Sequence, residues 1–158
     1  MRVLLVCLGN ICRSPTAEGI LRHKLEQAGL ADRVEVDSCG TGHWHLGKTP
    51  DRRARAAAAR RGFDLSALRA RQLDDSDFQR FDYLLAMDHD NLLALEARRP
   101  PDCQAHIGLF LDFAGYEDKA VPDPFFGGAR GFEEVLDLIE AGADGLIATL
   151  RRRLETSP

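Results

Sequence analysis

Long hydrophobic runs are absent from this sequence of 158 residues. A membrane-spanning helix needs about 20 consecutive apolar residues, so we expect no membrane segment. The first residues begin like a secretory leader, but Gly9 and Asn10 interrupt the apolar run after a few positions, and we expect a strand there. An excess of positive charge is absent too, because the formal net charge is −4. The chain therefore has no overall attraction to nucleic acid, and any bound anion must be held by local geometry.

Cysteine is scarce, and its spacing excludes two further classes of protein. The four cysteines show no paired C-x-x-C spacing and are too few for a disulfide scaffold in a chain of this length. No cluster of cysteine and histidine has the spacing of metal ligands, so we expect neither a metal site nor a cofactor. Reduced thiols are typical of cytoplasmic proteins, and the cytoplasm is the location that we expect.

What the sequence does contain is an alternation of strand-like and helix-like segments, without repeats or low-complexity linkers. Residues 3–7 are a continuous apolar run, as in a parallel strand that is covered on both faces. Ser14 is expected to cap the following helix, with Pro15 at its first position, and Gly29 to end it. The alternation predicts an α/β fold with an open parallel sheet, in a single domain of residues 1–158. Further strands are expected at 34–37, at 83–87 and within 105–111, and further helices at 50–61, at 89–98 and near the C-terminal end.

The loop after the first strand is the main candidate for a binding site, because ligands of such sheets bind beyond the carboxyl ends of the strands. Five residues separate Cys7 from Arg13, between a strand end and a helix start. Such a segment can curl so that successive backbone N–H groups form an anion-binding nest, to which the helix N-terminus contributes. Gly9 and Asn10 tolerate a positive φ, and Arg13 can donate two parallel hydrogen bonds to a tetrahedral oxyanion. The predicted phosphate-binding residues are Leu8, Gly9, Asn10, Ile11, Cys12, Arg13 and Ser14.

A nest built for a phosphate also stabilises a thiolate at its centre. Helix N-termini and nearby cations favour the ionised form of a cysteine, so we expect Cys7 to be a nucleophile. Ser14 can donate a hydrogen bond to the sulfur and stabilise it as a leaving group. The alternative is a thiol that is only buried at the end of a strand, as free cysteines often are.

Residues 6–15, with the sequence VCLGNICRSP, resemble the signature of the low-molecular-weight protein tyrosine phosphatases. The resemblance implies the flavodoxin-like fold of that family (phosphotyrosine phosphatase I), an open four-stranded parallel sheet flanked by helices on both faces. It also implies a metal-independent hydrolase that forms a phosphocysteine intermediate. Its expected substrates are phosphotyrosine in proteins or peptides and small aryl phosphates, its product is inorganic phosphate, and we expect a monomer or weak dimer.

Such a mechanism needs an acid for the leaving group and then a base for the attacking water. The family takes this group from an Asp-Pro-aromatic loop near the C-terminal end, and here Asp123 lies between Pro122 and Pro124, which stiffen the loop. The resemblance therefore assigns Cys7, Arg13 and Asp123 as catalytic residues. Taken alone, an Asp-Pro pair is typical of an ordinary turn. The aromatic residues Trp44, Phe125 and Phe126 are candidate walls for a tyrosyl ring.

Two positions leave questions open. Related sequences often carry a histidine at the position of Leu68, where it braces the asparagine of the loop, so the support of Asn10 from that side is in doubt. Cys12 is a candidate partner for a reversible disulfide with Cys7 that protects the nucleophile from further oxidation. The alternative for Cys12 is a small residue that packs beneath the loop.

Other activities of the same fold are the competing hypotheses. Thioredoxin-coupled arsenate reductases need two further cysteines in the segment that corresponds to residues 87–98, which contains none. Phosphoarginine phosphatases tend to have threonine at the position of Ile11, and an apolar residue suits an aromatic ring better. A non-catalytic phosphopeptide-binding module has no need of Cys7, Arg13 and Asp123 together.

Overall fold

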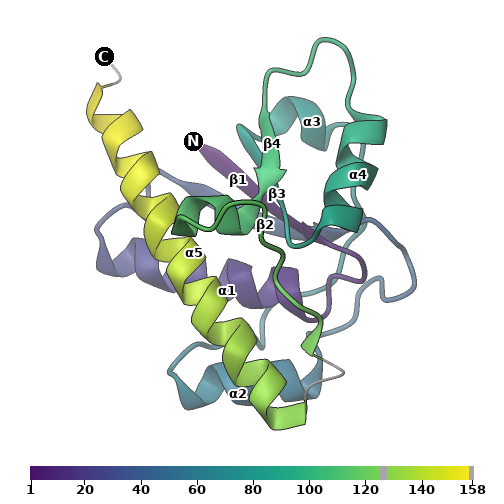
Figure 1. Ribbon diagram of the computed structural model, residues 1–158, viewed down its shortest axis with the longest axis vertical. Helices are drawn as coiled ribbons and strands as arrows, with labels where there is room; N and C mark the ends of the chain where they lie inside the picture. Colours follow the sequence, from purple (N-terminus) through teal and green to yellow (C-terminus); the bar gives the residue numbers. More distant parts are fainter. Residues whose placement is uncertain (125–127, 157–158) are drawn as a thin grey trace.

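The centre of the molecule is a single parallel sheet. The computed structural model describes residues 1–124 and 128–156. The sheet has four strands in the order β2-β1-β3-β4, and every neighbouring pair runs parallel (Figure 1). This arrangement confirms the predicted open sheet, and the strands lie within two or three residues of the predicted segments. Their bounds are β1 (Arg2–Cys7), β2 (Glu35–Gly40), β3 (Tyr83–Ala86) and β4 (His106–Leu109).

Helices cover both faces of the sheet, as predicted (Figure 1). The first, second and last α-helices pack on one face, and the third and fourth on the other, where they contribute to a separate apolar cluster. Two short elements, α3 and η1, were not expected, because segments of four and five residues are too short to show a helical period. The bounds are α1 (Arg13–Gln27), α2 (Arg52–Arg60), α3 (Asp77–Arg80), α4 (His89–Arg98), the 3-10 helix η1 (Phe110–Ala114) and α5 (Gly128–Thr156).

The apolar run of β1 is explained by this double cover. Val3 and Leu5 belong to the cluster formed with α1 and α5, whereas Leu4 and Val6 belong to the cluster on the opposite face. All four side chains are completely buried. Full burial of such a side chain contributes about 1.5–3 kcal/mol, so the strand that ends at Cys7 is firmly held.

The start of α1 differs from the prediction. The helix begins at Arg13, and Cys12, not Ser14, occupies the N-cap position, where its side chain makes no capping hydrogen bond. Pro15 is consequently the third helical residue, a position whose N–H has no partner within the helix anyway. The end of the helix agrees with the prediction, because Gly29 follows it with a φ of +74°.

The longest helix is α5, with 29 residues. Neither it nor any other helix in the described ranges combines the length and the hydropathy needed to cross a membrane.

Candidate active site

The loop between β1 and α1 curls beyond the carboxyl end of the central strand. Asn10 has the positive φ expected of it, +56°, but Gly9 does not adopt a positive φ. An added Cβ atom at position 9 would lie 3.0 Å from the ring of His45, so a larger residue would require a small shift of that side chain. The loop is also fixed from outside, because Thr41 N–H donates to Cys7 O over 2.9 Å and Gly42 N–H donates to Leu8 O over 2.9 Å.

Cys7 lies at the centre of this cradle and is only 3% exposed. The backbone N–H of Asn10 donates to Cys7 Sγ over 3.2 Å. The hydroxyl of Ser14 lies 2.9 Å from the same sulfur, which is the contact that the sequence predicted. Two polar groups therefore converge on the sulfur and can stabilise negative charge there.

The side chain of Asn10 holds the cradle together from below. Its Nδ2 group donates to Ser14 Oγ over 2.8 Å and to Ser38 Oγ over 2.9 Å. Its Oδ1 atom accepts a hydrogen bond of 2.9 Å from the backbone N–H of Arg71. The side-chain amide of Asn10 thus braces the cradle, as expected. Because this protein has Leu68 in place of the histidine, the hydrogen bond to Asn10 Oδ1 comes instead from the backbone N–H of Arg71.

The hydrogen-bond chain continues to a buried carboxylate on α1. Ser38 Oγ donates to Glu18 Oε1 over 2.7 Å, and Arg22 pairs with the other oxygen of Glu18 over 2.6 Å. Burial raises the pKa of Glu18, and the hydrogen bond from Ser38 and the charge of Arg22 oppose that rise. The cradle is therefore connected by side chains to the opposite end of β2.

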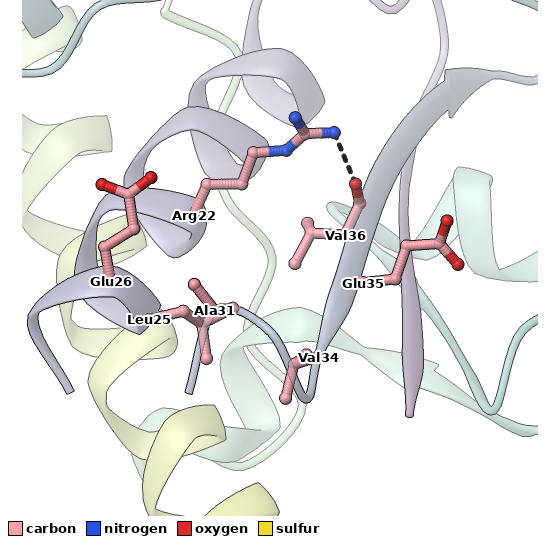
Figure 2. A pocket seen from close by; sticks show the side chains of 7 residues that line it. All are labelled: Arg22, Leu25, Glu26, Ala31, Val34, Glu35 and Val36. Atoms are coloured by element: carbon pink, nitrogen blue, oxygen red, sulfur yellow. Dashed lines mark hydrogen bonds between the residues drawn. The ribbon is translucent and has the colours of Figure 1, made fainter. Parts of the chain in front are cut away.

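Figure 2 shows the cavity that Arg22 reaches at that end, with the guanidinium donating to Val36 O over 2.6 Å. Its volume is about 370 Å³. Because it lies beside the start of β2, and Cys7 is the last residue of β1, at the opposite edge of the sheet, this cavity is not the site of the cysteine chemistry. The lining residues are Arg22, Leu25, Glu26, Ala31, Val34, Glu35 and Val36.

Arg13 closes the cradle and is held on one side only. Its Nη1 group donates to Asp88 Oδ2 over 2.7 Å and to Val121 O over 3.0 Å. Across residues 1–124 and 128–156, Nε and Nη2 have no hydrogen-bond acceptor within reach. Two parallel donors consequently remain for the two oxygens of an oxyanion.

Asp88 is a functional residue to which the sequence analysis assigned no role. It caps α4, where its side chain accepts from Asn91 N–H over 2.8 Å while the Asn91 side chain accepts from the backbone of Asp88. The cap orients the carboxylate, whose second oxygen then accepts from Arg13. Two signals in the sequence pointed to it: the resemblance of Met87-Asp88 to a pair found in the phosphatase family, and its place just after a buried strand, at the edge where ligands bind.

Asp123 follows a segment that is anchored beside the cradle. Val121 is fully buried, and its N–H donates to Met87 O over 2.7 Å, immediately after β3. Asp123 itself is exposed. Its charge acts on the cradle, because the pKa of Cys12 is raised to about 12 mainly by burial and further by the charges of Cys7, Asp51 and Asp123, while Arg13 opposes the rise.

Trp44 lies in the loop that packs against the outside of the cradle. The side chain is 62% exposed, stacks on His43 with ring centroids 5.5 Å apart, and folds over Gly42. It is therefore a surface group beside the cradle and not a core residue, as its predicted role requires. The other two predicted wall residues, Phe125 and Phe126, lie outside the described residues. Leu8 and Leu46 are exposed near Trp44 and add apolar surface to the same side.

Comparison with known proteins agrees with this geometry. The family model for the low molecular weight phosphotyrosine protein phosphatases matches residues 2–156. The chain belongs to this family. The low molecular weight protein-tyrosine-phosphatase of Streptomyces coelicolor is 44% identical over 159 residues, which cover 98% of this chain and 96% of the relative.

Solved structures of relatives confirm the predicted phosphatase fold. A protein tyrosine phosphatase from Entamoeba histolytica superposes with a TM-score of 0.91 at 38% identity and covers 96% of this chain and 97% of its own. A Drosophila arginine phosphatase superposes with a TM-score of 0.87 at 34% identity, over 95% and 98% of the two chains.

Proposed function

We propose that this protein hydrolyses phosphotyrosine in proteins or peptides, and small aryl phosphates, through a phosphocysteine intermediate on Cys7. One observation carries the proposal. The sulfur of Cys7 lies under a backbone N–H and a hydroxyl, in a cradle that is closed by an arginine with two unused nitrogen donors. A phosphate seated there has its oxygens at the arginine and its phosphorus above the sulfur.

The first step transfers the phosphoryl group. The thiolate of Cys7 attacks phosphorus in line, an S–P bond forms and the P–O bond to the tyrosyl oxygen breaks. Arg13 stabilises the equatorial oxygens with two parallel hydrogen bonds, and Asp88 keeps its guanidinium in place. The carboxylic acid of Asp123 donates its proton to the departing phenolate, so tyrosine leaves as a neutral phenol.

The second step releases inorganic phosphate. The carboxylate of Asp123, now deprotonated, accepts a proton from a water molecule whose oxygen attacks phosphorus. The S–P bond breaks, and the hydroxyl of Ser14, 2.9 Å from the sulfur, stabilises the thiolate as it leaves. The proton balance closes, because Asp123 ends the cycle protonated as it began.

The most direct test uses two variants. Cys7→Ser should abolish turnover of p-nitrophenyl phosphate and retain phosphate binding, and rapid quenching of the native enzyme should trap a phosphoprotein. Asp123→Asn should lower kcat by about 10²–10⁴-fold for phenols that are poor leaving groups and much less for good ones. A Cys7→Ser protein with native activity would contradict the covalent route.

The choice of substrate needs a side-by-side comparison, since one structural neighbour is an arginine phosphatase. The rates on phosphotyrosine, phosphoserine, phosphoarginine and arsenate should rank phosphotyrosine first. The apolar side chain of Ile11 in the cradle and the exposed ring of Trp44 beside it support an aromatic substrate. A higher kcat/KM on phosphoarginine would replace the proposal with the alternative activity.

Cys12 is proposed as the thiol that rescues an oxidised Cys7. Peroxide oxidises the thiolate of Cys7 to a sulfenic acid, and the sulfur of Cys12 then displaces its hydroxyl group, which leaves as water and forms the disulfide. Because the pKa of Cys12 is raised to about 12 by burial, its thiol is protonated at neutral pH and disulfide closure should accelerate as the pH rises. Mass mapping after mild peroxide treatment should find the linked peptide, and Cys12→Ser should accumulate the sulfinic acid instead. A native enzyme that forms sulfinic acid without any linked peptide would count against this role.

A further inference from the structure

Helix α2 carries arginines at both of its ends, and the two groups are treated differently. Arg61, just past the C-terminal end, makes ion pairs of 2.7–2.9 Å with three carboxylates of α5, and Arg60 contacts one of the same carboxylates. The group at the N-terminal end consists of Arg52, Arg53 and Arg55. We call these three residues the basic rim.

The basic rim adjoins the cradle. The residue before it, Asp51, donates its backbone N–H to Ile11 O over 2.6 Å, which ties the start of α2 to the phosphate-binding loop. The guanidinium of Arg53 lies over the ring of Phe132, 5.4 Å from its centroid, in the first part of α5. There α5 approaches the loop of Asp123, because a Cβ atom added to Gly131 would lie 3.1 Å from the carbonyl oxygen of Pro124. The rim is therefore linked on one side to the phosphate-binding loop and on the other to the part of α5 that approaches the loop of Asp123.

Among residues 1–124 and 128–156, two of the three arginines of the basic rim have no carboxylate partner. In the described part of the chain, no carboxylate lies within ion-pair distance of Arg52 or Arg55. Arg55 uses its Nε group on Pro50 O over 3.0 Å, and Arg53 approaches Asp51 at 3.5 Å, although that carboxylate already caps the helix. The first turn of α2 contains no acidic residue, so the arginines stand at the helix end where cations are unfavourable.

A hollow beside the rim offers room for a ligand. It measures about 330 Å³ and is lined by Arg52 and Arg55 on the helix side and by Asp64 and Ser66 on the other. The single carboxylate among these residues is exposed and accepts from the backbone of Ser66. The hollow thus presents two guanidinium groups at the N-terminal end of α2, the end that is hydrogen-bonded to the phosphate-binding loop.

We propose that the basic rim binds acidic side chains next to the phosphotyrosine of a substrate, so that the preferred substrates are acidic phosphotyrosine peptides. The inference rests on the proposed function and adds a substrate class to it. The net charge of −4 makes the rest of the molecule unfavourable for such peptides. The positive charge of the basic rim would attract the acidic side chains locally and so offset the repulsion by the negative charge of the rest of the molecule.

The test compares two phosphotyrosine peptides, one flanked by aspartate and glutamate and one by asparagine and glutamine. For the double variant Arg52→Gln/Arg55→Gln, kcat/KM on the acidic peptide should fall about threefold to tenfold, the product of two exposed ion pairs. The loss should appear in KM and should shrink at high salt. The values for the neutral peptide and for p-nitrophenyl phosphate should not change.

Two further variants separate local contact from general charge. Arg151→Gln/Arg152→Gln removes the same charge from the C-terminal end of α5, far from α2 (Figure 1), and should leave the acidic preference intact. Arg52→Lys/Arg55→Lys should restore most of it. An acidic preference that is unchanged in Arg52→Gln/Arg55→Gln, or lost equally in the distant variant, overturns the inference.

Failure of the proposed function would be visible separately. If p-nitrophenyl phosphate is not hydrolysed, the catalytic proposal fails. Binding of the same two peptides to Cys7→Ser, and to Cys7→Ser that also carries Arg52→Gln/Arg55→Gln, still decides whether the rim binds acidic side chains. A ratio of Kd values that does not depend on the rim would overturn the inference there as well.

Discussion

Two arginines of this protein, Arg61 and Arg13, are both bound by carboxylates, but Arg61 joins two helices whereas Arg13 keeps donors for a ligand. Every nitrogen of the Arg61 guanidinium is engaged, with Glu133 and Glu140 among its partners at 2.7 and 2.8 Å. Burial alone would lower the pKa of Arg61, but its hydrogen bonds to Glu140, Glu133 and Asp137 outweigh burial and raise it. This arginine joins α2 to α5 and has no capacity left for a ligand.

Within residues 1–124 and 128–156, Arg13 has a single carboxylate partner and uses a single nitrogen of its guanidinium, Nη1. Its side chain is 11% exposed, less than the 25% of Arg61, so greater exposure does not explain its free donors. The difference lies in the number of partners. A guanidinium whose nitrogens all donate to carboxylates stabilises the fold. A guanidinium that uses only one nitrogen in this way keeps its other N–H donors for an anion.

Arg13→Lys should have the largest effect. Lysine keeps the charge but cannot donate two parallel hydrogen bonds, so kcat on p-nitrophenyl phosphate should fall about 100- to 1,000-fold. The free energy of unfolding should change little. A loss of less than tenfold would mean that point charge alone suffices and that the planar geometry of Arg13 is unimportant.

Asp88→Asn should have an intermediate effect. The single amide oxygen of asparagine can still cap α4, but its NH2 group then faces Arg13 in place of an acceptor oxygen, and we expect kcat/KM to fall about fivefold to tenfold. The dissociation constant of inorganic phosphate should rise in parallel, which a purely structural role would not produce. Unchanged phosphate affinity together with a lower melting temperature would assign Asp88 to folding alone.

Arg61→Gln should have the smallest effect on activity and a clear effect on stability. The three carboxylates around it would lose their shared cation, and we expect the free energy of unfolding to fall by about 1–2 kcal/mol in a urea titration. Activity should stay within about twofold of the native value. Arg60→Gln is the matched control, since Arg60 is 60% exposed with one ion pair, and it should cost at most about 0.5 kcal/mol. A large loss of activity in Arg61→Gln would break the comparison with Arg13.

Much of the fold was predictable from the sequence because the signals are local. A continuous apolar run, a helical period and a glycine after a helix each depend on neighbouring residues, and α4 has the predicted bounds of 89–98. The wrong prediction at the start of α1 also concerns neighbouring residues. Ser14 was expected to cap α1 because serine favours that position, but its hydroxyl is used on Cys7 and Asn10 instead. Contacts within the loop overrode the capping preference of this residue.

The sequence by itself determined the loop that we propose to bind phosphate, since Cys7, the residues that curl around it and Arg13 follow one another between β1 and α1. Only the tertiary structure decided how that loop is held. Asp88 and Val121 contact Arg13 across 75 and 108 residues, and the backbone of Arg71 reaches Asn10 across 61. These partners meet because β1 lies between β2 and β3, so that the carboxyl ends of distant strands share one edge of the sheet. No pattern of neighbouring residues encodes such a meeting, which depends on the order of the strands.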